Sequence, residues 1–250
     1  MDFTLKKYLE ILTELIQCAY EFQTFASFIK NPKTKAVILR HDVDLLPKNS
    51  LEFARLQSNR NIQGVYYFRS VPQSWDENII KEISEMGHEI GYHYECLTTH
   101  KGNLNLAMDL FKSDLDKLRK IANVETICMH GSPMSKYDSK DMWKKFNYKD
   151  YGIIGEPYFD VNFNEVMYLT DTGRTWKNQK ISVRDHVDSR FSFDISSSND
   201  LIENLKKEVL PDQIMFNFHP QRWTNNPLLW GKELVFQNIK NQIKRIIVKA

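Results

Sequence analysis

A chain of 250 residues, of which 42% are hydrophobic, can bury one sizeable core, and α/β barrels reach this length without dividing. Its 34 basic and 32 acidic residues leave a net charge of +2, so no strong field favours nucleic-acid binding. No apolar run approaches the roughly 20 residues that span a bilayer, and the three cysteines lack the spacing of a disulfide framework. We therefore expect one cytoplasmic domain over residues 1–250, with no nucleic-acid partner and no transmembrane segment.

The first predicted elements are a helix and a series of strands. Leu5, Leu12 and Ile16 lie at helical spacing, which predicts a helical extension within residues 1–34. Apolar strand-like runs then alternate with helix-length segments, which predicts a parallel sheet or barrel with helices outside it. The predicted strands span residues 36–39, 64–68, 89–94, 126–130, 152–154, 166–169 and 214–218. The predicted helices between them span residues 50–59, 75–86 and 104–118.

Two later segments interrupt this alternation. Residues 151–193 are rich in strand formers and turn residues, which predicts an antiparallel hairpin or irregular loops inserted in the α/β pattern. The C-terminal segment 227–250 carries Val235, Phe236 and Ile239 at helical spacing, with Lys240 and other cations on the remaining faces. We expect this helix to cover the barrel, and the alternative is a helix that lies on a membrane surface.

Polar side chains follow the carboxyl ends of several predicted strands. They are His41, Asp42 and Asp44 after the first strand, His93 and Glu95 after the third, His130 after the fourth and His219 after the last. The carboxyl ends of the strands of a parallel barrel meet at one rim, so these groups become neighbours there. Asp42 and Asp44 point the same way, because side chains alternate along an extended segment. The pattern predicts a shared metal or a divided acid–base task, whereas a single histidine of this kind is often only a hydrogen-bonded packing residue.

The motifs around these residues resemble those of the NodB-homology polysaccharide deacetylases, the fourth carbohydrate esterase family. Residues 38–44 (ILRHDVD), 87–93 (GHEIGYH) and 216–220 (FNFHP) are similar to its first, second and last motifs. The similarity is greatest to a divergent branch with Arg-His-Asp-Val-Asp, His-Gly-Ser-Pro and His-Pro-Gln-Arg-Trp motifs, which is associated with surface-polysaccharide gene sets. The resemblance implies a distorted (β/α) barrel with N- and C-terminal helices packed on it. It also implies a divalent metal cofactor, for which zinc is preferred.

Two departures from the family pattern leave the metal-ligand set open. Val43 separates the two aspartates, so position alone does not decide which is the base, and Leu97 stands where the family has a second histidine. The third ligand must come from elsewhere, and the candidates are His130, Glu95 and His100. We prefer His130, which ends a strand beside a glycine, because Asp plus two His is a set that catalytic zinc accepts.

The resemblance then implies a role for each residue. The metal ligands are Asp44, His93 and His130. Asp42 is the general base, and His219 stabilises the oxyanion or protonates the leaving amine.

Further residues are predicted to complete the site. Arg184 and Asp185 offer a cation to orient a carboxylate and a carboxylate to orient an imidazole, and the alternative is an ordinary ion pair on a loop. Aromatic faces stack on sugar rings, and guanidinium groups hold carboxylates or phosphates. The predicted substrate-binding residues are Glu95, Asp171, Arg174, Trp176, Arg222 and Trp223, and the alternative for them is packing.

We therefore expect a metal-dependent carbohydrate N-deacetylase. Its substrate would be a small or carrier-linked amino sugar, nucleotide-linked or lipid-linked, in surface-polysaccharide biosynthesis. One alternative is an amidase or deformylase that acts on a non-sugar substrate with the same barrel. Another is a carbohydrate-binding protein that has lost catalysis because Leu97 replaces a ligand. The sugar, the acyl group and the oligomeric state stay open.

Overall fold

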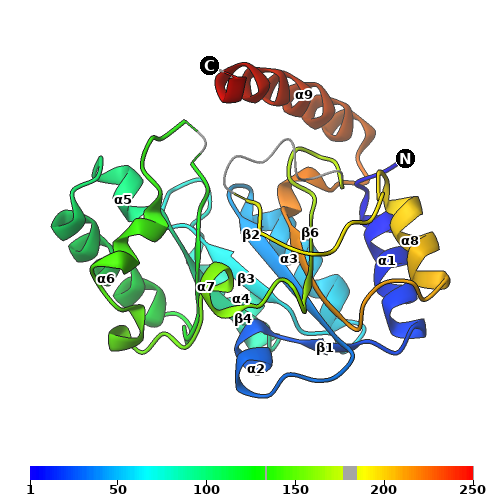
Figure 1. Cartoon of the computed structure of the whole chain (residues 1–250), viewed down its shortest axis with the longest axis horizontal. Coiled ribbons are helices and arrows are strands. Elements are labelled where there is room, and N and C mark those ends of the chain that lie inside the picture. The colour runs from blue at the N-terminus through cyan, green and yellow to red at the C-terminus, as the bar shows by residue number, and fades with distance from the viewer. Residues whose placement is uncertain (133, 177–184, 250) are drawn as a thin grey trace.

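A computed structural model describes residues 1–132, 134–176 and 185–249 of the chain, with side chains as far as residue 242. Its centre is a sheet of seven strands in which every ladder is parallel, curled into a half-barrel (Figure 1). The strand order is β5-β4-β3-β2-β7-β6, and β1 pairs with the first part of β2. The strands are β1 (Glu21–Gln23), β2 (Ala36–Val43), β3 (Val65–Phe68), β4 (Glu89–Tyr94), β5 (Ile127–Met129), β6 (Met167–Thr170) and β7 (Gln213–Phe218). The predicted α/β fold with parallel strands is confirmed.

Helices connect the strands, and most of them lie around the sheet (Figure 1). They are α1 (Leu5–Gln17), α2 (Phe25–Lys30), α3 (Pro47–Ser58), α4 (Glu77–Glu85), α5 (Cys96–Thr99), α6 (Leu104–Arg119), α7 (Pro157–Asp160), α8 (Ser198–Lys206) and α9 (Pro227–Lys249). Short 3-10 turns are η1 (Ser139–Lys144), η2 (Tyr148–Tyr151) and η4 (Pro220–Arg222). Helix α1 begins where the Thr4 hydroxyl accepts the Lys7 N–H, and it buries Tyr8, Leu12 and Leu15. None of the described helices is long and apolar enough to cross a membrane.

The alternation of side chains along β2 decides what faces the inside of the half-barrel. Val37 and Leu39 belong to the larger core under the helices, whereas Ala36 and Ile38 belong to a separate inner cluster. His41 continues the outer set: it is fully buried, its Nδ1 donates to the carbonyl of Val65, and burial lowers its pKa to about 3. His41 is therefore a neutral packing residue, and the strand-end chemistry predicted for it is absent.

The inner face changes from apolar to polar toward the carboxyl ends of the strands. In β2, Arg40 and Asp42 follow Ala36 and Ile38 on the same face, because side chains alternate with a period of two. The same change occurs in β7, where Asn217 follows Met215. The fold thus directs charged groups into one end of an otherwise apolar half-barrel.

Two predicted segments differ from the structure in their secondary structure. The predicted strand at residues 152–154 is not found, because Gly152 ends η2 with a φ of 70°, and only an isolated parallel bridge joins Thr126 to Gly155. The N-terminal extension is not entirely helical, since β1 lies between α1 and α2, and its three residues are too few to show a strand period. In the segment 151–193, the described pairing of β6 with β7 is parallel, which favours the irregular loops over the hairpin.

The C-terminal helix α9 is present, but its apolar side does not cover the barrel. Val235, Phe236 and Ile239 are each more than half exposed. The buried side chains on α9 include the polar Gln237 and Asn241, and Nδ2 of Asn241 donates to the carbonyl of Gly173 (2.9 Å). The expectation that these apolar residues pack on the barrel is wrong.

Glu89, at the start of β4, makes the stability of the fold depend on pH. Its Oε2 accepts the backbone N–H of Ala26 in α2, its Oε1 accepts the Thr126 hydroxyl, and burial raises its pKa to about 6. The folded protein therefore binds more protons at Glu89 than the unfolded chain does, so stability falls as pH rises through this range. We expect the free energy of unfolding to drop by about 1 kcal/mol between about pH 4 and pH 7, because Glu89 is only partly shielded from water.

The variant Glu89→Gln measures this effect by urea unfolding at several pH values. A glutamine accepts from Ala26 and donates to Thr126, and it carries no charge at any pH. The drop should therefore be smaller in the variant than in the wild type. Equal pH dependence in the two proteins would show that Glu89 ionises normally in the folded state.

Candidate active site

Three side chains from separate strand ends converge at one point. Asp44 follows β2, His93 lies in β4 and His130 follows β5. Nε2 of His93 and Nε2 of His130 each lie 3.5 Å from Oδ1 of Asp44. The potential ligand atoms of the three residues all lie within 4.8 Å of one another. The carboxyl ends of parallel strands thus bring together the predicted set of Asp44, His93 and His130.

The two imidazoles of this cluster are oriented through their other ring nitrogens. Nδ1 of His93 donates to the carbonyl of Cys128 (2.9 Å), and Nδ1 of His130 donates to Oε2 of Glu95 (3.1 Å). These bonds leave Nε2 of each ring as the nitrogen that can bind a metal. Both histidines are therefore held with that nitrogen toward Asp44.

Glu95 is hydrogen-bonded to His130, although it was predicted to contact substrate or to serve as the third ligand. Its Oε1 accepts from Nε and Nη2 of Arg69 at 2.8 and 2.6 Å, while its Oε2 accepts from His130. Burial opposes ionisation, but His130 and Arg69 outweigh it and lower the pKa of Glu95 to about 2. The ionised carboxylate has both oxygens occupied, which favours an orienting role.

The cluster has the spacing and the unmet bonding capacity of a metal site. Oδ1 of Asp44 is buried and has no hydrogen-bond partner among the described residues, which is an unfavourable state for a carboxylate oxygen. Atoms that lie about 2.0–2.2 Å from one zinc ion at tetrahedral angles are roughly 3.3 Å apart. The 3.5 Å separations of Asp44 from His93 and His130 are close to this value. A divalent cation therefore fits these donors.

A second group of potential ligands, formed by Asp42, His93 and Cys128, fits a metal less well. Burial raises the pKa of the Cys128 thiol well above its ordinary value, so the thiolate that binds metals is disfavoured. Asp42 is already bound by Arg40. The Asp44 cluster is therefore the better candidate.

Asp42 is held at the edge of this cluster by a buried arginine. Nε and Nη2 of Arg40 donate to its two carboxylate oxygens at 2.8 and 2.7 Å, and Nδ2 of Asn217 donates to Oδ2 at 3.0 Å. Burial by itself would raise the pKa of Asp42, but the charge of Arg40 helps to outweigh it, and the pKa lies below its ordinary value. Oδ2 of Asp42 is 3.7 Å from Nε2 of His93. An ionised carboxylate with fixed geometry thus stands beside the candidate metal ligands.

His219 is oriented by a fully buried carboxylate. Its Nδ1 and its backbone N–H donate to Asp171 at 2.6 and 3.0 Å, while its Nε2 lies 3.8 Å from Oδ2 of Asp44. Asp171 also accepts from Nη1 of Arg222 (2.8 Å) and from Nε1 of Trp223 (2.5 Å). Asp171, Arg222 and Trp223 were predicted to bind substrate. The structure instead makes them the support that fixes the His219 ring.

Asp185 lies in a network of hydroxyl groups. Its carboxylate accepts hydrogen bonds from the side chains of Tyr158, Tyr168, Thr170 and Thr172. The hydroxyls of Tyr158 and Tyr168 also lie 3.3 and 3.5 Å from the Arg40 guanidinium. Asp185 therefore supports the surroundings of Arg40, in place of the predicted role of orienting an imidazole. Arg184, its predicted partner, lies outside the described residues.

Three side chains that were predicted to bind substrate pack against other side chains of the protein instead. Trp176 is only 3% exposed and packs against Phe216 and Phe218, while Trp223 is fully buried. The Arg174 guanidinium lies 4.4 Å from the ring centre of Trp230, and its Nη1 donates to the Trp230 carbonyl. Neither indole face is free to stack on a sugar, so the alternative of packing is correct for both tryptophans.

We expect Trp176→Ala to destabilise the protein by about 3–5 kcal/mol, because it empties a large volume of the core. The milder variant Trp176→Phe keeps most of the packing and loses the hydrogen bond from Nε1 to the Ser198 hydroxyl. Chemical denaturation of both variants measures the effect. An increase in KM with unchanged stability in Trp176→Phe would instead assign this ring to substrate binding.

Neither Leu97 nor His100 belongs to the candidate ligand cluster. Leu97, in the place of the missing histidine, is buried in the hydrophobic core. His100 ends α5, and it does not belong to the metal-ligand groups found among the described residues.

Several polar residues of the site were not singled out from the sequence. They are Arg40 and Asn217, which hold Asp42, and Arg69, which holds Glu95. Gln221, next to the predicted Arg222 and Trp223, donates from Nε2 to Oδ2 of Asp44 (3.1 Å). The strand period could have found Arg40, because it lies two residues before Asp42 on the same face. Arg69 directly follows β3, at a strand end where no polar residue had been considered.

The fold and the site together define a parallel α/β half-barrel with a carboxylate–imidazole cluster at the carboxyl ends of its strands. No protein-family model matches the chain, and no curated protein matches it either.

Among solved structures, the chain is similar to a CE4 family pseudoenzyme from Bacillus anthracis, with 11% identity and a TM-score of 0.46. That match covers 86% of this chain and 63% of the pseudoenzyme, so the chain spans less than two thirds of its length. The family 4 carbohydrate esterase PdaA from Bacillus subtilis matches with 14% identity and a TM-score of 0.43, over 92% of this chain and 84% of that one. A family 4 carbohydrate esterase from Streptomyces lividans in complex with acetate matches with 11% identity and a TM-score of 0.41, over 82% and 88%. These structures belong to the family whose motifs the sequence resembles.

Proposed function

We propose that the protein is a metal-dependent hydrolase that removes an N-acetyl or related N-acyl group from an amino sugar. The observation that carries the proposal is the convergence of Asp44, His93 and His130 around a buried carboxylate oxygen that has no partner among the described residues. An ionised Asp42 and an oriented His219 stand beside the same cluster. Hydrolysis of an amide requires such a base, such an acid and a means of polarising the carbonyl.

Each residue has a task in this reaction. Asp44, His93 and His130 would hold the divalent metal, for which zinc is the preferred ion. When bound, such a metal lowers the pKa of a water molecule and polarises an amide carbonyl. Asp42, kept ionised and rigid by Arg40, takes the proton of the attacking water.

His219 completes the reaction on the leaving-group side. As the imidazolium, with a proton on each ring nitrogen, it gives the Nε2 proton to the leaving amine nitrogen, or donates a hydrogen bond from Nε2 to the oxyanion. Asp171 keeps the ring in the tautomer with a proton on Nδ1 and stabilises the imidazolium when it forms.

The substrate class rests on the motif resemblance, and we propose a nucleotide-linked or lipid-linked amino sugar used to build a surface polysaccharide. A reducing, cytoplasmic setting is supported by the free thiols of Cys18, Cys96 and Cys128.

Elemental analysis and product assays test the proposal. Wild type purified without added metal should contain a divalent metal, and His93→Ala and His130→Ala should lose it. His100→Ala removes an imidazole outside the cluster and is the matched control. Wild type should then release acetate from N-acetylated nucleotide or lipid-linked sugars.

Other products would point to other functions. Release of formate or ammonia from a non-sugar amide would favour the amidase or deformylase. Sugar binding without metal or turnover, even after reconstitution with zinc, would favour a silent binding protein.

A further inference from the structure

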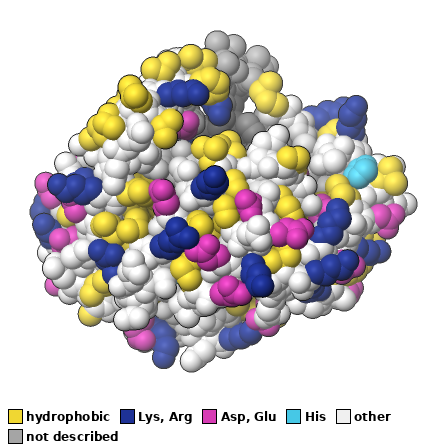
Figure 2. All heavy atoms as spheres, turned by 180° about the vertical axis from the view of Figure 1, so that it is seen from behind, with side chains coloured by type: hydrophobic (Ala, Val, Ile, Leu, Met, Phe, Trp, Pro, Cys, Tyr) yellow, Lys and Arg dark blue, Asp and Glu magenta, His cyan; other side chains and the backbone are white. Residues whose placement is uncertain are grey.

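Several apolar side chains in the described part of α9 face solvent. We call this side the outer face of α9 and define it by Leu228, Leu229, Val235, Phe236 and Ile239, which are 84%, 56%, 60%, 54% and 54% exposed. Figure 2 shows hydrophobic side chains gathered on this helix at the top of the view, with Lys and Arg side chains among them. Large apolar side chains gathered on an exposed surface in this way are typical of an interaction site.

The rotation of α9 about its axis is set by contacts on its opposite side. Nε1 of Trp230 donates to the carbonyl of Asp2 (2.7 Å), and Nδ2 of Asn241 donates to the carbonyl of Gly173 (2.9 Å). Gln237, one turn before Asn241, is also buried and donates to its side chain. Because the polar side is bound to the protein, the outer face is the side turned away from it.

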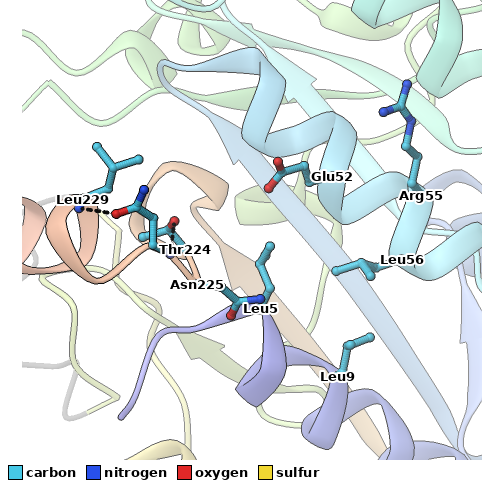
Figure 3. Close-up of a pocket in the computed structure, with 9 residues that line it drawn as sticks. Leu5, Leu9, Glu52, Arg55, Leu56, Thr224, Asn225 and Leu229 are labelled. Carbon is cyan, nitrogen blue, oxygen red and sulfur yellow. Dashed lines mark hydrogen bonds between the residues drawn. The ribbon is translucent and has the colours of Figure 1, made fainter.

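A groove lined by both leucines and polar side chains, among them Glu52 and Arg55, lies next to the outer face on the body of the protein. The groove has a volume of about 630 Å³ and lies between α1, α3 and the start of α9 (Figure 3). Leu5 and Leu9 of α1, Leu56 of α3 and Leu229 of α9 line it. Leu229 belongs to both surfaces, so the leucines of the groove adjoin the outer face.

The charge of α9 distinguishes between possible occupants. Residues 227–250 contain five Lys or Arg residues and one acidic residue, whereas the whole chain has 34 basic and 32 acidic residues. Lys232 is exposed within the outer face, and the Lys240 ammonium lies 5.3 Å from the ring centre of Phe236. A second copy of the chain would bring this positive charge against itself. An anionic lipid surface complements it and also accepts the apolar side chains.

We propose that α9 binds the surface of an anionic membrane, with the outer face inserted among the lipid headgroups and its lysines beside the phosphates. The helix begins a few residues after His219, at the carboxyl ends of the strands, so membrane binding keeps that end of the half-barrel near the lipid (Figure 1). The substrate can then be narrowed, which rests on the proposed function: of the nucleotide-linked and lipid-linked amino sugars, membrane binding favours the lipid-linked one.

Vesicle sedimentation with the full chain tests the proposal independently of activity. Wild type should sediment with vesicles of phosphatidylcholine and phosphatidylglycerol, and much less with phosphatidylcholine alone. Val235→Glu/Ile239→Glu should reduce the partition coefficient by about tenfold or more, as charge replaces inserted apolar area. Lys232→Gln/Lys240→Gln should reduce it by roughly fivefold per lysine. Leu106→Glu/Val209→Glu, which adds the same charges at sites that are each 50% exposed, should bind like wild type.

Two results would overturn the proposal. One is wild type that stays in solution with anionic vesicles. The other is a wild type that is a dimer in light scattering, together with a Val235→Glu/Ile239→Glu variant that is a monomer and still binds vesicles like the wild type. The outer face would then bind a second copy of the chain. Thermal unfolding of each variant checks that the exposed substitutions leave the fold intact. Wild type that binds anionic vesicles but shows no deacetylase activity would refute the proposed function and leave the membrane proposal standing.

Discussion

Asp42→Asn should lower kcat by about 10²–10⁴-fold and leave the metal content unchanged, because the variant loses a general base and keeps the metal ligands. The asparagine amide oxygen would still accept a hydrogen bond from Arg40, but its NH2 group faces another donor and the buried Arg40 loses its charged partner, so thermal unfolding must be measured beside activity. Asp44→Asn should behave differently. It removes the carboxylate that joins the two imidazoles, so bound metal should be lost together with activity.

Stopped assays of acetate release, together with elemental analysis, separate the two carboxylates. Asp114→Asn is a suitable control, because it neutralises another buried carboxylate, one that binds Ser70 and Tyr92 on the helix-covered side. If Asp42→Asn loses its metal and Asp44→Asn retains it, the two roles are exchanged.

Asp171→Asn should lower kcat by about 10²–10⁴-fold through its effect on His219. The amide of an asparagine would direct N–H toward Nδ1 of His219, which favours the tautomer with its proton on Nε2 and removes the charge that stabilises the imidazolium. The metal content should stay unchanged, since Asp171 does not contact the Asp44 cluster in the described hydrogen bonds. The expected signature is thus a lower kcat with full metal occupancy.

The variant Asp171→Asn also leaves the buried Arg222 without its charged partner, so thermal unfolding must be measured beside activity. Trp223→Phe is the matched control. It removes another hydrogen bond to Asp171 and leaves the His219 contact in place. Near-wild-type kcat in a folded Asp171→Asn would mean that His219 needs no buried carboxylate for its task.

Much of the fold followed from local patterns. Six of the seven strands were predicted within a few residues, because each is a short segment rich in apolar or aromatic residues. The three-residue β1 was missed, and residues 152–154 were mistaken for a strand. In both cases a short segment carries too little periodicity to reveal its pairing.

The candidate ligand set could be predicted from the sequence, but the residues that orient it could not. Asp44, His93 and His130 stand at strand ends, and parallel strands bring their carboxyl ends to one rim. The sequence could not show that Asp171 holds His219, because 48 residues separate them and the contact depends on how β6 lies beside β7. The same holds for Trp176 and Trp223, which look like sugar-stacking residues in the sequence and are core residues in the fold.

The sequence by itself determined the parallel α/β fold, the amphipathic C-terminal helix and the acid and imidazole groups at the strand ends, since all three depend on the spacing of residues that are near neighbours in the chain. Only the tertiary structure decided which polar residues meet one another and which side of α9 remains exposed. Those outcomes depend on strand order and helix rotation, which are set by long-range packing and by buried hydrogen bonds such as that from Asn241 to Gly173.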